Sequence, residues 1–236
     1  MESNKISSGS KMQNLGRFWL ISFIIGSLSC TSDDTGYDPC KNLIRVEPVQ
    51  VSFESRSWID YSLHQTLRFV AADSSRIQFI AKSLFVPSVQ LSDFNVSCPY
   101  DSNQLQKVEV PLKSLTTVFE NADSTHPLRF IQLEIKTVLD TRNSSLDKLV
   151  LADVLAIWVQ TRSANLRQIL SYPVFDRGYT YPIECSYLFI DQLHLDSKIF
   201  NDVYYNSEQN DAPVLYLSGK KIIALIWRGK TYLANS

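Results

Sequence analysis

Alternation of apolar and polar residues with a period of two is the feature that most limits what this chain can fold into. It is clearest in residues 131–136, where every second side chain is apolar and the others are Gln, Glu and Lys. Successive side chains of a strand point to opposite faces, so such a run buries one face and leaves the other in water. Similar alternating runs occupy residues 44–53, 66–70, 76–79, 107–110, 183–189 and 231–233, and wholly apolar runs occupy residues 214–217 and 222–227. The pattern predicts a mainly β protein, built as an antiparallel β-sandwich or meander.

Turn residues between these runs indicate hairpins. Asp73-Ser74-Ser75 separates two of them, and Ser218-Gly219-Lys220 and Arg228-Gly229-Lys230 separate the last three. Glycine adopts the positive φ that tight hairpin turns require. Residues 222–226 are apolar at every position, which is typical of an interior strand covered on both faces. We therefore expect a meander at the carboxyl end.

The segment 144–170 supports two interpretations. Ser144 and Asp147 have the spacing of a helix cap, whereas the valines and isoleucines of residues 150–159 favour strand. Residues 149–159 contain one charged residue, Asp153, and are expected to be buried in either case. We expect strands here, with a short helix within 144–170 as the alternative.

The amino-terminal segment has the layout of a secretory signal. Arg17 precedes an apolar run, Phe18–Leu28, of about eleven residues, too few for a permanent span of a roughly 30 Å hydrocarbon core. Ser27-Leu28-Ser29-Cys30 resembles a lipobox, the processing site of bacterial lipoproteins. That resemblance implies cleavage before Cys30 and acylation of its sulfur and its new amino group. Met12 offers an alternative start that leaves the mature protein unchanged.

Three regions follow from this reading: a signal peptide (1–29), a polar tether (30–42) and one β-rich globular domain (43–236). The acidic pair Asp33-Asp34 resembles the export signal of outer-membrane lipoproteins of Bacteroidota; a solvated acidic linker is the equally weighted alternative. The resemblance implies a cell-envelope protein held in a lipid bilayer by Cys30, in the outer membrane and with surface exposure as a further expectation.

The carboxyl-terminal region carries a second resemblance. Residues 193–233, which include VLYLSGKKIIALIWRGKTYL, look like the terminal hairpins of uncharacterised Bacteroidota lipoproteins, and residues 58–82 resemble their early hairpin more weakly. The shared features are strands and turns. The resemblance therefore implies a secreted or outer-membrane lipoprotein with a β-rich body, and it implies no particular chemistry.

Charge and motif content argue against several classes of function. Removing residues 1–29 takes away three basic residues and one acidic residue, which leaves 20 basic and 23 acidic residues. Without a basic stripe interleaved with aromatics, nucleic-acid binding is not expected. His64, His126 and His194 lack the spacing of a metal site, and no GxSxG or glycine-rich phosphate loop is present. We predict no catalytic residue, metal or cofactor.

Tyrosines concentrated late in the chain are the candidate ligand surface: Tyr172, Tyr179, Tyr181, Tyr204 and Tyr205. A phenol ring offers a flat apolar face and a hydroxyl, which suits contact with a glycan or an envelope protein, although half-buried strands also favour tyrosine. The sequence hypothesis is thus a non-catalytic envelope lipoprotein with a binding or scaffolding domain. The alternative is an envelope hydrolase that acts on glycan or peptide through carboxylates paired in space, drawn from Glu54, Glu109, Glu134 and Glu184.

Three cysteines remain after lipidation, so one internal disulfide at most can form. Cys185 shares the apolar face of the run 183–189 and is expected to be a buried free thiol. Cys40 and Cys98 lie beside Pro39 and Pro99 at the ends of strand-like runs. We predict a Cys40–Cys98 disulfide, with three unpaired thiols as the alternative.

Overall fold

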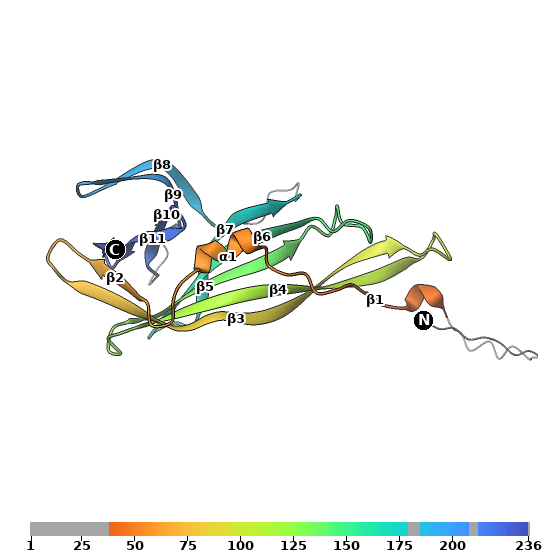
Figure 1. Ribbon diagram of the computed structural model, residues 1–236, viewed down its shortest axis with the longest axis horizontal. Helices are drawn as coiled ribbons and strands as arrows, with labels where there is room; N and C mark the ends of the chain where they lie inside the picture. The colour runs from red at the N-terminus through yellow and green to blue at the C-terminus, as the bar shows by residue number, and fades with distance from the viewer. Residues whose placement is uncertain (1–37, 179–184, 208–211, 236) are drawn as a thin grey trace, which may run out of the picture. The chain divides into compact units, whose positions relative to one another are not determined.

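Antiparallel strands form nearly all of the regular structure in the computed structural model, which describes residues 38–178, 185–207 and 212–235 (Figure 1). Contacts group the chain from Asp38 onward into one unit. The signal segment 1–29, Cys30, Tyr179 and Tyr181 lie outside the described residues. The strands are β1 (Ile44–Arg45), β2 (Thr66–Val70), β3 (Arg76–Ser97), β4 (Leu105–Asn121), β5 (Leu128–Leu139), β6 (Leu151–Thr161), β7 (Arg167–Arg177), β8 (Leu188–Leu195), β9 (Lys198–Tyr205), β10 (Val214–Ser218), β11 (Lys221–Trp227) and β12 (Lys230–Asn235).

Two meanders join into one sheet with the order β7-β6-β5-β4-β3-β2-β12-β11-β10-β9-β8. The junction is the antiparallel pair β2–β12, in which Val70 faces Leu233. The sheet curls, and the backbone N–H of Ser171 in β7 donates to the carbonyl oxygen of Ser186, just before β8, at 3.1 Å. The mainly β antiparallel fold predicted from the sequence is confirmed, in the form of a meander.

Alternate side chains of these strands build the core. Phe79, Phe119 and Ile131 are among the fully buried residues of the larger hydrophobic cluster, which also contains Phe69 and Leu155. A second, smaller cluster of buried residues involves the carboxyl-terminal part of β3 and the amino-terminal part of β4. It comprises Phe94, Val108, Val110, Leu112, Leu139 and Leu151. Burial of these side chains is the main contribution that stabilises the sheet.

The predicted strand at 44–53 is wrong beyond its first residues. Only Ile44–Arg45 forms a strand, parallel to β4, and Val49 makes one further bridge to it. Residues Phe53–Arg56 form the short helix α1, because the Ser52 hydroxyl caps its first turn by accepting from the N–H of Ser55 at 3.2 Å. Two 3₁₀ turns, η1 (Pro39–Lys41) and η2 (Ser57–Ile59), complete the helical structure. Within the described part of the chain, no helix is long and apolar enough to cross a bilayer.

The strands expected within 144–170 are confirmed, because this segment holds β6 and the start of β7, and the alternative short helix does not form; residues 141–147 make turns. Seven successive residues at the start of β6 are buried, as the nearly uncharged run predicts. The strand predicted at 183–189 begins only at Leu188. Cys185 is free but partly exposed, so the prediction of a buried thiol is also wrong.

The chain contains a Cys40–Cys98 disulfide, with Cα atoms 5.5 Å apart, which is the pair selected from the sequence. The bond attaches η1 to the end of β3. The side-chain amide of Gln106 in β4 also donates to the carbonyl oxygens of Pro39 and Asn42. Residues 38–42 are therefore part of the folded unit, and the expected tether boundary at 43 lies too late in the sequence.

Candidate functional site

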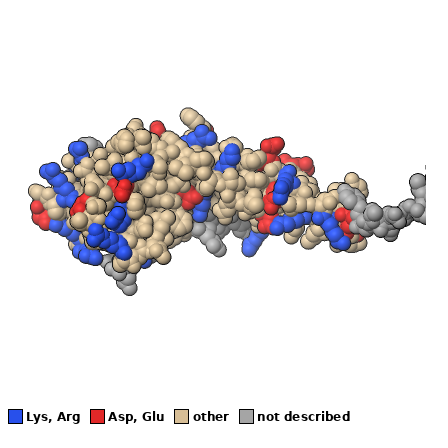
Figure 2. Space-filling model, turned by 90° about the horizontal axis from the view of Figure 1, so that it is seen from below, with Lys and Arg blue, Asp and Glu red and all other residues tan. Residues whose placement is uncertain are grey.

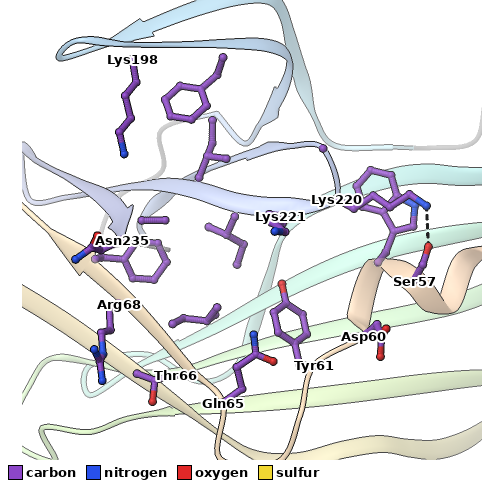
Figure 3. Close-up of a pocket in the computed structure, with 18 residues that line it drawn as sticks. Ser57, Asp60, Tyr61, Gln65, Thr66, Arg68, Lys198, Lys220, Lys221 and Asn235 are labelled. Carbon is purple, nitrogen blue, oxygen red and sulfur yellow. Dashed lines mark hydrogen bonds between the residues drawn. The ribbon is translucent and has the colours of Figure 1, made fainter.

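A cavity of about 550 Å³ is bounded by β2, β9, β11, β12 and the η2 segment (Figure 3). Its walls come from two distant parts of the chain, residues 57–69 and residues 198–235. The β2–β12 pair places these parts side by side. The volume falls within the usual range of ligand sites, roughly 300–1,000 Å³.

Aromatic and aliphatic side chains form the inner wall of the cavity. Phe69 is fully buried, and Tyr61 packs edge to face on Phe119 with ring centroids 4.8 Å apart. Trp58, Phe200 and Ile222 complete this wall. Trp58 and Tyr61 pack against the main core, which contains Phe69 and Ile222.

Two neutral polar groups point from the lower wall toward β11 (Figure 3). The Gln65 side-chain oxygen accepts from the backbone N–H of Ser62 at 2.8 Å, which leaves its NH₂ directed at the cavity. The Tyr61 hydroxyl has no hydrogen-bonding partner among the described residues, and burial raises the pKa of Tyr61 to about 12. Both groups are placed to bond a ligand.

Four cations line the cavity: Arg68 of β2, Lys198 of β9, Lys220 in the β10–β11 turn and Lys221 of β11. The Lys220 ammonium donates to the Ser57 hydroxyl at 2.7 Å (Figure 3), and Lys198 extends from β9 toward β2 and β12. Asp60 is the only carboxylate among the described lining residues. The cavity therefore has a local excess of positive charge in a body whose acidic residues outnumber its basic ones.

The positive region continues beyond the cavity. A second hollow of about 330 Å³ shares Arg68 and Asn235 with it and adds Arg76 and Gln78. Figure 2 shows Lys and Arg side chains gathered over the end of the sheet that carries β2. An anion approaching this end meets attractive charge before it reaches the cavity.

Some of the predicted tyrosines come together, and one unpredicted tyrosine joins them. Tyr172 and Tyr204 have ring centroids 4.0 Å apart, and Tyr187 lies 5.3 Å from Tyr172. Phe189 contacts Tyr204 at 5.1 Å. We call these four residues the aromatic cluster. Burial, followed by the hydrogen bond with Tyr204, raises the pKa of Tyr172.

The remaining predicted tyrosines do not belong to this cluster. Tyr205 stacks on Tyr216 at 5.2 Å in a separate pair, and Tyr179 and Tyr181 lie outside the described residues. Trp58 links the two aromatic regions, because it lines the cavity and its ring lies 5.4 Å from that of Tyr172. The cavity and the aromatic cluster are therefore adjacent.

Two of the four carboxylates considered for hydrolysis make contacts away from the cavity. Glu109 pairs with Arg45 at 2.8 Å and Glu134 accepts from the Trp158 indole at 3.0 Å; neither lines the cavity. Glu54 lies in α1, and Glu184 is outside the described residues. The structure groups no three His, Cys, Asp or Glu residues in a metal-binding arrangement within its described ranges.

Comparison with protein-family models, curated proteins and solved structures finds no match.

Proposed function

We propose that this protein is a lipid-anchored component of the bacterial cell envelope whose β-rich body binds an anionic ligand in the cavity, without catalysing a reaction. The observation that carries the binding part is the set of four cations, Arg68, Lys198, Lys220 and Lys221, around an aromatic wall. None of the four has an ion-pair partner among the described residues. A bound anion would supply the missing counter-charge.

The anchoring part of the proposal rests on the sequence around Cys30. The proposal further assigns the protein to the outer membrane, with its body exposed at the cell surface. Two or more acyl chains give stable membrane attachment, whereas one gives marginal attachment.

Binding is tested with 8-anilinonaphthalene-1-sulfonate, an aromatic anion that matches the charge and the wall. Titration of the full chain, followed by calorimetry and by the fluorescence of the bound probe, is expected to show one saturable site. Because Lys198 and Lys221 are exposed, the double variant Lys198→Glu/Lys221→Glu should fold normally and bind at least about tenfold more weakly, a difference of about 1.4 kcal/mol. Lys148→Glu, which reverses one charge at an exposed position outside the cavity, is the control. Unchanged affinity in the double variant would contradict the proposal.

Anchoring is tested by metabolic labelling with a fatty-acid analogue. We expect the wild-type chain to carry label and to sediment with membranes, and Cys30→Ala to lose both properties. Equal labelling of the two chains would refute acylation at Cys30.

A further inference from the structure

Strand β9 connects the cavity to the aromatic cluster. Lys198 and Phe200 line the cavity, and Tyr204 lies in the cluster. Asp202, between these positions, has φ 50°, which interrupts the regular alternation of faces along β9. Trp58 therefore makes the link between the two regions, because it lines the cavity and its ring lies 5.4 Å from that of Tyr172. Six residues of strand span about 20 Å at roughly 3.3 Å per residue. The combined surface is therefore longer than a compact small molecule, and it suits an extended chain.

Two aromatic side chains remain partly exposed along this surface. Tyr187 is 37% exposed and Phe189 is 45% exposed, although both rings already contact Tyr204. Flat aromatic faces with accessible hydroxyls pack well against molecules that have both apolar C–H faces and polar edges. A sugar ring has both kinds of surface.

The lining of the cavity distinguishes a sugar from an acyl chain. The cavity lining includes polar groups such as the Gln65 NH₂, the Tyr61 hydroxyl and Asn235 as well as the rings. An acyl chain would take these groups out of water without bonding them, at a cost of about 1–3 kcal/mol for each group left unpaired. The hydroxyls of a sugar chain would bond them.

We infer that the surface from the cavity to the aromatic cluster binds a chain of acidic sugars. The carboxylates or sulfates of the chain pair with Lys198, Lys221 and Arg68, and its rings pack on Trp58 and Tyr187. This inference rests on the proposed function, and it names the class of ligand. A uronate and a sulfated glycan share the required chemistry.

The experiment measures the affinity of the full chain for four probes by calorimetry: oligogalacturonate, chondroitin sulfate oligosaccharides, neutral malto-oligosaccharides and poly-glutamate. We expect one or both acidic glycans to bind at least about tenfold more tightly than the neutral glycan and the acidic peptide. Tyr187→Ala should weaken acidic-glycan binding about fivefold, equivalent to roughly 1 kcal/mol, and leave anilinonaphthalene sulfonate binding in the cavity unchanged. Tyr100→Ala, at a 79% exposed position outside the cavity and the cluster, is the matched control.

The possible failures are distinguishable. Equal binding of poly-glutamate and acidic glycans, or an unchanged glycan affinity in Tyr187→Ala, would overturn the sugar inference while the anion site stands. Equal binding of neutral and acidic glycans would overturn the acidic requirement. If Lys198→Glu/Lys221→Glu bound both the acidic glycan and the sulfonate as tightly as the wild-type chain does, both the inference and the proposed function would be overturned.

Discussion

At the scale of single residues, Asp153 shows how a charge is accommodated in the interior of β6. Its side chain is fully buried, and it accepts hydrogen bonds from the Ser52 N–H, the Ser55 hydroxyl and the Thr137 hydroxyl at 2.8–2.9 Å. The Arg177 guanidinium lies 3.7 Å away. A buried charge is tolerated when it is paired and hydrogen-bonded. Asp153 thus attaches the α1 segment to the sheet, a structural role for the one charge in the apolar run.

Replacing Asp153 tests that role. Asp153→Ala leaves three donors and Arg177 without their common acceptor, so we expect the free energy of unfolding to fall by about 3 kcal/mol. Asp191→Ala, on the exposed strand β8, should change it by less than about 0.5 kcal/mol. Urea denaturation measures both values. A loss at Asp153 no larger than that at Asp191 would contradict the attachment.

The Asp73–Lys230 pair gives a pH dependence. The Lys230 ammonium hydrogen-bonds the Asp73 carboxylate and lowers its pKa from 3.8 to about 2. Since the folded pKa lies below the unfolded one, the pair stabilises the fold above about pH 4, and this contribution disappears as the pH falls toward 2. In Lys230→Gln, the carboxyl titration of Asp73, followed by NMR, should shift up toward its ordinary value. Lys82→Gln, which removes a different ion pair, should leave it in place.

At the scale of elements, local turn chemistry explains why the last strands could be predicted. Both residues of each turn have positive φ: Gly219 and Lys220 at 55° and 67°, and Arg228 and Gly229 at 52° and 74°. This geometry matches the twist of a two-residue hairpin. The length of β3 could not be predicted, because Phe85 has φ 49° and residues 86–91 are all exposed, which breaks the alternation. The helix α1 was missed because its cap at Ser52 depends on a local bond within an alternating run.

The interior position of β11 leads to a truncation test. β11 lies between β10 and β12, and β12 is the only partner that joins the carboxyl-terminal strands to β2 among the described pairings. Truncation after Gly219 removes both strands and should abolish the cooperative thermal transition. Deletion of Ser236 alone should preserve it. A cooperative melt of the chain ending at Gly219 would refute an essential role for these strands.

At the scale of the whole molecule, the cavity could not be predicted from sequence. Its cations are isolated in the chain, apart from Lys220-Lys221, and each fits an exposed strand or turn position. Only the β2–β12 pairing brings Arg68 near residues of β11 and β12. The tyrosine hypothesis, based on the concentration of tyrosines late in the chain, identified Tyr172 and Tyr204, whose rings do meet. It missed Tyr187, and it included Tyr205, which stacks elsewhere.

Removing the disulfide tests how much the closure of a long loop contributes to the free energy of unfolding. Cys40 and Cys98 are 58 residues apart, and closing such a loop contributes about 4 kcal/mol in the chain-entropy model. Cys40→Ser/Cys98→Ser should therefore lower the free energy of unfolding by a similar amount and remove its sensitivity to reductant. Cys185→Ser, at the free thiol, should retain that sensitivity. A reductant effect that persists in the double variant would contradict the assignment.

The position of the disulfide determines how the protein would respond to pulling. The Cys40–Cys98 disulfide holds the start of the folded unit at one end of β3. Arg76, at the other end of this 22-residue strand, lies next to β2 and lines the second hollow (Figure 1). These ends are up to about 70 Å apart along the strand. With Cys30 held in a membrane, as proposed, tension from a captured ligand would run along β3 and β4. The hydrogen bonds between these two strands would then be loaded in shear and would have to break together. The sheet would therefore resist a pulling force far better than a hairpin whose strands are pulled apart from the open end, where the bonds break one at a time.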